Sequence, residues 1–363
     1  MGRTSPVRVA LIFGGQSSEH SISCLSAGSI LAAIDRERYE VTAVGICRDG
    51  RWVEVTSEPE HWRQIDGVLP GVVDGRPVVL AADPTRSPAD LEGQLDVDVV
   101  FPVLHGAYGE DGTIQGLLEL AGVPYVGSGV LASAAVMDKT ATKALLAEGG
   151  LPVGNYVSIP DRSWRLERER VLAAVGKLNY PLFVKPARAG SSVGISKVSE
   201  PAELEAGIVE ARKHDVRVIV EESVERAREI ECGVLHVSGS DRPKASVCAE
   251  ILVGAEHTFY DFAAKYLDDT TQVVVPADLP PAVLKEVQES AVRAFEVMGC
   301  EGLARVDFFV KPDGQIVINE LNTMPGFTEI SMFPRMWDES GIGYSDLIDA
   351  MLKRALQKDR ELF

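Results

Sequence analysis

Two carboxylates and an amide near the end of the chain could hold a divalent cation. Asp307 precedes the turn signal Lys311-Pro312-Asp313-Gly314, and Glu320 and Asn322 follow it. Two strands joined by this turn would align the three side chains, because Glu320 and Asn322 are two apart and share one face. Oxygen donors of this kind suit Mg²⁺, which combines a few protein ligands with substrate phosphates. The alternative is a solvated polar face with Arg305 as salt-bridge partner, which the apolar flanking residues disfavour.

A loop of small residues offers a second chemistry. The run Arg188-Ala189-Gly190-Ser191-Ser192-Val193-Gly194 follows the strand-like Phe183-Val184-Lys185-Pro186. Free backbone N–H groups in such a loop can cover phosphates, while Lys185 supplies a point charge. The spacing matches neither the Walker A pattern nor the G-x-G-x-x-G dinucleotide pattern. The alternative interpretation is an ordinary flexible connector.

A third polar group follows the first apolar strand. Gly14-Gly15-Gln16-Ser17-Ser18-Glu19-His20 occupies the position at the carboxyl end of a parallel strand, where α/β proteins bind ligands. The alternative is a helix start, with Ser17 or Ser18 as N-cap and Glu19 in the first turn. His105 also follows a strand, and a lone histidine there is more often structural than catalytic.

The elements that position these residues form two patterns. The first third alternates apolar strand-like runs with helical patterns, which predicts parallel βαβ units. The runs are Val7–Phe13, Ile22–Ile34, Val41–Ile46, Val97–Leu104 and Ile114–Leu120. The last third has strand-like runs and one long helix that do not alternate strictly, which favours the α+β class. The runs are Glu229–Val237, Lys244–Val253, Pro281–Gly299 (the helix), Arg305–Val310 and Gln315–Glu320.

The middle of the chain predicts a compact unit and the last third a long loop. A helix is expected to begin at Asp138, and from Tyr180 the pattern is strand, glycine-rich loop, helix and strand, ending near Ser223. The segment Gly254–Gln272 has no clear periodicity, and a loop of this length inside a compact domain is usually a lid or a binding loop.

Composition limits the function classes. The 363 residues suggest two or three domains, and the net charge of −18 disfavours nucleic acid or an anionic membrane as partner. The five cysteines show neither CxxC pairs nor zinc-site spacing, which disfavours a disulfide framework or a zinc site. Neither a signal peptide nor a spanning segment is predicted, so we expect a cytoplasmic protein.

Taken together and in order, the motifs resemble the D-alanine:D-alanine ligases of the ATP-grasp superfamily over nearly the whole chain. They are GGQSSEHSIS, LHGAYGEDGTIQG, MDK, FVKPARAGSSVG, FYDFAAKYLDDTTQ, ARVDFF and INELNTMPGFTEISMFP. The resemblance implies α/β and α+β parts in a three-domain ATP-grasp architecture with an N-terminal parallel α/β (pre-ATP-grasp) domain. The expected domains are 1–126, 127–223 with the phosphate loop, and 224–363 with the lid and the magnesium site.

The resemblance also implies site residues for ATP and two Mg²⁺ ions, with Mn²⁺ as a substitute. Lys139 and Lys185 would contact phosphates, and Ser191 and Ser192 would close over them. The other nucleotide-site residues implied are Glu221, Glu222, Val224, Glu229, Lys265 and Asn319. The implied metal ligands are Asp307, Glu320 and Asn322. At the adenine hinge this chain has Glu221-Glu222-Ser223-Val224, where some members carry Lys and Trp.

For the amino-acid substrates, the resemblance assigns Glu19 to the ammonium of the first D-alanine, in place of the N-cap interpretation. Arg305 and the backbone of Gly326 would stabilise an oxyanion, and Tyr266 would hydrogen-bond toward Ser191 and Glu19. The remaining substrate-binding residues implied are His105, Lys265, Ser331 and Met332.

The implied reaction is ATP-dependent joining of two D-alanines through an acyl phosphate, for peptidoglycan precursor synthesis, with the lid excluding water. Ala264-Lys265-Tyr266 matches the dipeptide-forming members, so D-lactate or D-serine as second substrate is the alternative within the class. A catalytically idle ATP-binding module and an NAD-dependent dehydrogenase are alternatives from other classes. The first would have lost a metal ligand or Arg305, and the second needs a dinucleotide fingerprint. By analogy with the family we expect a homodimer.

Overall fold

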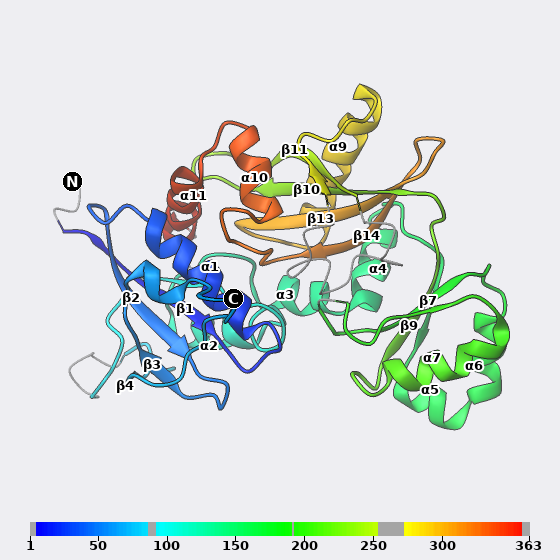
Figure 1. Ribbon diagram of the computed structural model, residues 1–363, viewed down its shortest axis with the longest axis horizontal. Coiled ribbons are helices and arrows are strands. Elements are labelled where there is room, and N and C mark those ends of the chain that lie inside the picture. The colour runs from blue at the N-terminus through cyan, green and yellow to red at the C-terminus, as the bar shows by residue number, and fades with distance from the viewer. Residues whose placement is uncertain (1–4, 86–91, 191, 253–271, 358–363) are drawn as a thin grey trace.

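The computed structural model describes residues 5–85, 92–190, 192–252 and 272–357, and these residues form three β-sheets with their helices (Figure 1). The sheet of β1–β5 and the sheet of β6–β9 lie at opposite ends of the molecule, and the sheet of β10–β14 lies above and between them. In the part of the chain that is described, no helix is both long enough and apolar enough to cross a lipid bilayer.

The first sheet has the order β4-β3-β2-β1-β5. Its strands are β1 (Val7–Gly14), β2 (Tyr39–Ile46), β3 (Trp52–Glu54), β4 (Arg76–Pro77) and β5 (Val99–Pro102). The predicted parallel pairing is confirmed for β1 with β2 and with β5, whereas β3 and β4 add an antiparallel edge. Its helical elements are α1 (His20–Ala33), η1 (Pro59–Trp62) and α2 (Thr113–Ala121). The side chains of β1 from Val9 to Phe13 are almost fully buried, as expected for a strand covered on both faces.

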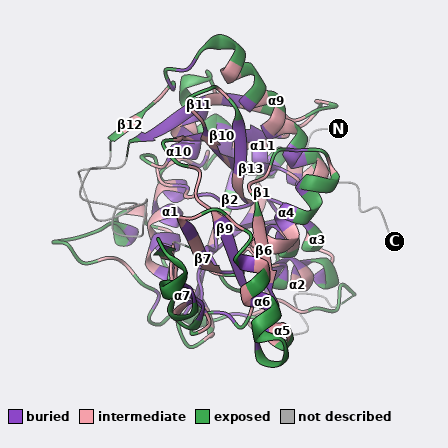
Figure 2. Cartoon of the chain, turned by 90° about the vertical axis from the view of Figure 1, so that its right-hand side faces the viewer, coloured by how far each residue is buried: buried purple, intermediate pink, exposed green. Residues whose placement is uncertain are grey.

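The second sheet is antiparallel with the order β6-β9-β7-β8. Its strands are β6 (Tyr156–Ile159), β7 (Leu182–Pro186), β8 (Ser196–Val198) and β9 (Val218–Glu222). The helical elements of this part are α5 (Asp161–Leu166), α6 (Arg168–Val175), η3 (Pro201–Glu203) and α7 (Leu204–Ala211). These elements enclose a core of their own around Val184 and Val220, and the outer faces of α5, α6 and α7 are exposed (Figure 2).

The third sheet is antiparallel with the order β12-β11-β10-β13-β14. Its strands are β10 (Arg228–Leu235), β11 (Lys244–Leu252), β12 (Gln272–Val274), β13 (Leu303–Val310) and β14 (Ile316–Asn322). The helices that follow its strands are α9 (Pro281–Val297), α10 (Met332–Glu339) and α11 (Tyr344–Gln357). The turn predicted at Lys311–Gly314 joins β13 to β14, closed by a 2.9 Å hydrogen bond from the Gly314 N–H to the Lys311 carbonyl.

Two segments pack against sheets other than the ones next to them in sequence. The helices α3 (Val130–Met137) and α4 (Lys139–Glu148) share a core with the third sheet, although the predicted central domain 127–223 groups them with the second. Helix α11 returns to the first sheet, where Met351 and Leu352 share a core with Val9 and Phe101. The domain limits at 126 and 223 therefore stay a prediction, while the packing shows a molecule tied together by both segments.

Candidate active site

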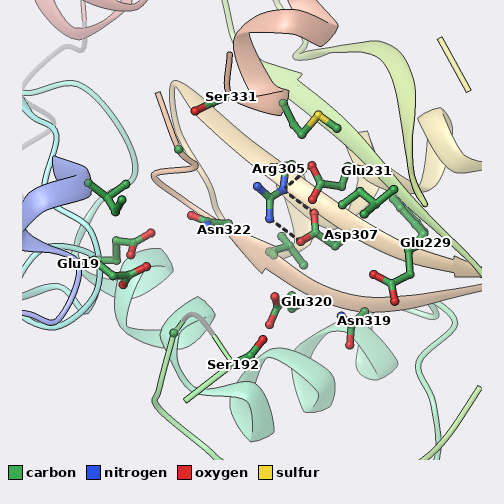
Figure 3. Close-up of a pocket in the computed structure, with 18 of the residues that line it drawn as sticks. Glu19, Ser192, Glu229, Glu231, Arg305, Asp307, Asn319, Glu320, Asn322 and Ser331 are labelled. Atoms are coloured by element: carbon green, nitrogen blue, oxygen red, sulfur yellow. Dashed lines mark hydrogen bonds and ion pairs between the residues drawn. The ribbon is translucent and has the colours of Figure 1, made fainter. Parts of the chain in front are cut away.

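A cavity of about 1490 Å³ opens between the three sheets. Most of the site residues that the sequence predicts line it, and Figure 3 shows several of them converging from different elements. The lining includes Glu19, Lys139, Lys185, Ser192, Glu221, Glu222, Val224, Glu229, Arg305, Asp307, Asn319, Glu320, Asn322, Gly326, Ser331 and Met332. Ser191, Lys265 and Tyr266, with nearly all of the predicted lid at 254–272, lie outside the described residues.

The predicted metal ligands come together where the end of β14 pairs with the middle of β13. The register places Asp307 opposite Glu320 and Arg305 opposite Asn322, with an irregularity after Asp307. The Asn322 Oδ1 accepts a 3.0 Å hydrogen bond from the Met324 N–H, which fixes the amide. Two carboxylates and one amide oxygen fit Mg²⁺. The Asp307 carboxylate already attracts a cationic side chain in the structure, because Arg305 donates two 2.7 Å hydrogen bonds to it.

The Arg305 side chain is buried, with 13% of it exposed. Burial opposes its charge, but the nearby carboxylates of Asp307 and Glu231 outweigh burial and raise the pKa of Arg305 well above its ordinary value. The guanidinium is therefore permanently charged at one wall of the cavity, where it could stabilise an oxyanion.

The phosphate side of the cavity is held by a buried network that includes Lys185. Glu221 accepts from Lys185 Nζ at 2.6 Å and from Lys143 Nζ at 3.0 Å. Burial opposes the Glu221 charge, but the two lysines overcome this and lower its pKa to about 2. Glu221 is thus a fixed anion that positions Lys185 at the cavity surface. Lys143 was missed from the sequence because its partner is far away along the chain and only the fold joins them.

Lys139 lies between the phosphate loop and the acidic pair. It begins α4, where the Asp138 side chain caps the helix by accepting from the N–H groups of Thr140 and Ala141. This confirms the helix start predicted at Asp138. Lys139 Nζ donates to the Ala189 carbonyl at 2.8 Å and lies 3.9 Å from Glu320. A cation placed here reaches both the glycine-rich loop and the metal ligands.

The segment expected to bind adenine follows β9, and the side chain of Glu222 in this segment is hydrogen-bonded to other parts of the protein. Glu222 accepts from Asn155 Nδ2 at 3.0 Å and from the Asn179 backbone N–H at 2.8 Å. These contacts occupy the Glu222 side chain and fix the hinge in place, which is compatible with recognition of the nucleotide by backbone groups of the hinge. Val224 follows in the cavity lining, and Glu229 lies on β10.

Across the cavity, Glu19 precedes α1 and lines the opposite wall (Figure 3). It occupies the N-cap position, yet its side chain makes no capping hydrogen bond, and the Ser17 Oγ accepts from the Glu19 N–H at 3.1 Å instead. Gly106 is required beside it, because a Cβ there would lie 2.6 Å from Glu19 Oε2 and the backbone φ is +76°. Burial, followed by repulsion from Glu19, raises the pKa of the neighbouring Glu110 to about 8.

His105 lies behind the wall that carries Glu19, and its predicted contact with substrate stays a prediction. Its side chain is buried and is not part of the described cavity lining. Nδ1 lies 3.1 Å from the Met324 carbonyl and Nε2 lies 3.2 Å from Ser26 Oγ. Burial lowers its pKa. Both ring nitrogens are thus engaged with the protein, and in this arrangement the His105 ring supports the wall behind Glu19.

The loop before α10 supplies the last predicted group. Ser331 Oγ accepts from the Thr328 N–H at 3.1 Å, and a Cβ at Gly326 would lie 3.1 Å from the same oxygen. Met332 is mostly buried and packs with Ile251 and Met336. Gly326 and Ser331 are therefore adjacent at the cavity, on the side of Arg305.

Family models and named relatives match this chain over almost all of its length. The D-ala D-ala ligase N-terminus model matches residues 8–128, and the D-ala D-ala ligase C-terminus model matches residues 145–353. The D-alanine--D-alanine ligase of Rhodococcus opacus (strain B4) is 54% identical over 366 residues, covering 97% of each chain. That of Mycobacterium sp. (strain JLS) is 54% identical over 375 residues, covering 99% of this chain and 98% of the relative.

Solved structures give the same result. The VanG D-Ala:D-Ser ligase from Enterococcus faecalis has a TM-score of 0.83 at 36% identity, covering 97% of this chain and 100% of its own. The D-alanine-D-alanine ligase from Coxiella burnetii has a TM-score of 0.79 at 34% identity, covering 97% and 94%. The fold is therefore that of an ATP-grasp carboxylate–amine ligase. Within that class, the chain belongs to the D-alanine–D-alanine ligase family.

Proposed function

We propose that this chain joins two D-alanines into D-alanyl-D-alanine, with release of ADP and phosphate, for peptidoglycan precursor synthesis. The observation that carries the proposal is one cavity in which Glu19 faces Arg305 and the pair Asp307 and Glu320. An anion for an ammonium group, a cation for an oxyanion and oxygen ligands for a metal are the groups this chemistry requires. The relatives named above support the choice of substrate.

The nucleotide would bind with its phosphates at Lys139, Lys185 and Ser192, under the glycine-rich loop. Its adenine would lie at the hinge, with Glu229 at the ribose. Further nucleotide contacts are proposed for Glu221, Asn319 and Lys265.

Asp307, Glu320 and Asn322 would hold two Mg²⁺ ions, with Mn²⁺ as a substitute. When bound, the ions neutralise charge on the transferring phosphoryl group. Lys139 lies 3.9 Å from Glu320 and would add its charge at the same place.

The two substrates would react in sequence. Glu19 pairs with the ammonium of the first D-alanine and leaves its carboxylate free to attack the γ-phosphorus of ATP. The bond from that phosphorus to the bridging oxygen breaks, ADP leaves and an acyl phosphate forms. The neutral amine of the second D-alanine attacks the carbonyl carbon, Arg305 and the Gly326 N–H stabilise the oxyanion, and phosphate leaves. The second substrate is assigned to Lys265, Ser331 and Met332.

Water must be kept from the acyl phosphate, because water would hydrolyse it. We assign this task to the lid at 254–272. Tyr266 would hydrogen-bond toward Ser191 and Glu19 once the lid covers the substrates.

Phosphate release tests the proposal. Enzyme, ATP and Mg²⁺ are incubated with D-alanine, with L-alanine or without an amino acid, and the product is identified by mass. Release that depends on D-alanine and yields the dipeptide is expected. Release without D-alanine dependence, with ATP still bound, would contradict the ligase and favour the ATP-binding module. Parallel reactions with D-alanine plus D-serine or D-lactate separate the alternatives within the class.

By analogy with the family, we propose a cytoplasmic homodimer. Light scattering of the purified protein measures the assembly directly. A mass near 78 kDa, about twice the chain mass of 39.1 kDa, is expected for the dimer.

A further inference from the structure

Arg305 lies between two carboxylates in the cavity wall, only one of which is a predicted metal ligand. Its Nε lies 2.7 Å from Asp307 Oδ1 and 3.2 Å from Glu231 Oε2. Figure 3 shows the guanidinium between these two side chains. In the register of β10 with β13, Glu231 is directly opposite Asp307, and Gly233 is opposite Arg305. Glu231 therefore reaches the guanidinium from the neighbouring strand.

The three side chains are buried together. Their exposed fractions are 13% for Arg305, 13% for Asp307 and 5% for Glu231. Two anions thus share one cation in a site with little solvent, where an unpartnered charge is strongly unfavourable. The sequence gives a faint signal for this arrangement, because Glu229 and Glu231 alternate on one strand and share its cavity-facing side.

The arrangement conflicts with the proposed metal site unless Arg305 has a second partner. Both oxygens of Asp307 accept from Arg305, so a cation on Asp307 and Glu320 would compete with the guanidinium and repel it. In the strand order β10-β13-β14, Glu231 lies on one side of Asp307 and Glu320 lies on the other. Glu231 is thus the anion placed to keep Arg305 when Asp307 turns to a metal.

We propose that Glu231 is a positioning residue, which holds Arg305 by its Nε while Asp307 serves the metal ions. The proposal rests on the proposed function. Held at Nε, the guanidinium keeps its Nη atoms for the oxyanion. Without Glu231, Arg305 would be bound to Asp307 alone, and each would hinder the other's task.

Arginine-detected NMR tests the positioning without metal or turnover. The Arg305 Nε–Hε signal is assigned by its loss in Arg305→Lys and followed in Asp307→Ala. A signal that stays protected from exchange in Asp307→Ala, and disappears in Asp307→Ala with Glu231→Gln, is expected. Loss of protection in folded Asp307→Ala alone would overturn the proposal, because Glu231 would then not hold the guanidinium.

Kinetics provide the second test, with a matched control. When Asp307 serves the metal, Arg305 Nε would donate to Glu231, so Glu231→Gln should lower kcat about 10- to 100-fold, the range for weakening a hydrogen bond to a charged group, and leave the KM for ATP unchanged. Glu231→Asp should recover part of the rate. The control is Glu250→Gln, which removes the partner of Arg228 in the same sheet (2.6 Å) from a residue outside the described cavity lining and should leave kcat unchanged.

A double-mutant cycle separates positioning from a general field effect. In the Arg305→Ala background, Glu231→Gln should cause no further loss of kcat. A full additional loss, or a single Glu231→Gln variant with kcat within about twofold of wild type, would overturn the proposal. Wild-type enzyme that shows no D-alanine-dependent release would instead contradict the proposed function, and the NMR result would still report on Glu231.

Discussion

Replacing Lys143 with methionine tests the buried network behind the phosphate site. Lys143 is 3% exposed, and its Nζ lies 3.0 Å from Glu221, so methionine fills the volume while removing the charge. Glu221 keeps Lys185 at 2.6 Å. The variant therefore loses one of two charged hydrogen bonds to a buried anion, and its free energy of unfolding at pH 7 should fall by about 2 kcal/mol.

The pH dependence of stability gives an independent magnitude. The pKa of Glu221 is lowered from 4.5 to about 2 in the folded protein. Stability from this carboxylate is present above pH 4.5 and is lost as the pH falls toward 2. Because a pKa difference of one corresponds to about 1.4 kcal/mol, the charged network contributes about 3 kcal/mol. Lys143→Met should reduce this contribution and so flatten the loss of stability between pH 5 and pH 3.

The consequence for catalysis is an increase in the KM for ATP. With Lys143 absent, Glu221 attracts only Lys185 and holds it away from phosphate more firmly. Urea unfolding between pH 3 and pH 7 and ATP-dependent rates measure both effects. The control is Lys285→Met, whose exposed pair with Glu289 at 3.7 Å should contribute under about 0.5 kcal/mol. A Lys143→Met variant that matches this control in stability and KM would refute the reasoning.

Three further substitutions test the cavity. Asp307→Asn should lower D-alanine-dependent phosphate release at least about 100-fold, since a charged metal ligand is lost. Isothermal titration should show weaker Mn²⁺ binding, and unchanged Mn²⁺ affinity would contradict the assignment. Gly106→Ala should raise the KM for D-alanine, because its Cβ would lie 2.6 Å from Glu19 Oε2. The control is Gly341→Ala, where the backbone φ is +87° but a Cβ would have nothing within 4 Å, so only the stability should change. Equal KM values in the two variants would refute the contact. The pKa of Glu110 is raised to about 8, so its protonated form stabilises the fold below pH 4.5, and that contribution is lost as the pH rises through 8. Between pH 6 and pH 9, the free energy of unfolding of Glu110→Gln, measured in urea, should fall by about 1–2 kcal/mol less than that of the wild type. A pH dependence equal to that of the wild type would exclude the buried acid.

Local sequence signals predicted the elements that carry the proposed metal ligands. Alternation in β13 and β14 and the turn Lys311–Gly314 predicted both strands and their pairing, because such hairpins are determined by neighbours in sequence. The register then places Asp307 opposite Glu320. The helix start at Asp138 was also predicted, since a cap is a local interaction.

Non-local packing accounts for what the sequence did not predict. Helix α3 is apolar apart from Ser133 and shows no helical stripe in sequence, and it packs against α2, α4 and β14. The strands β3 and β4 are too short to show a period. The contact of the His105 ring with the Met324 carbonyl could not be predicted, because the two residues are more than two hundred positions apart in the chain. Pairs such as Glu231 with Arg305 require the sheet order before they can be recognised.

The return of α11 to the first sheet has a consequence for how the chain acquires its structure. Met351, Leu352 and Ala355 complete a core that begins at Val9. During synthesis on a ribosome, the first sheet emerges hundreds of residues before the helix that covers it, so its apolar face stays open to chaperones or to aggregation until translation is almost finished. A fragment of residues 1–126 expressed alone should therefore bind hydrophobic dyes, and nascent chains should gain protease resistance only after α11 has left the exit tunnel.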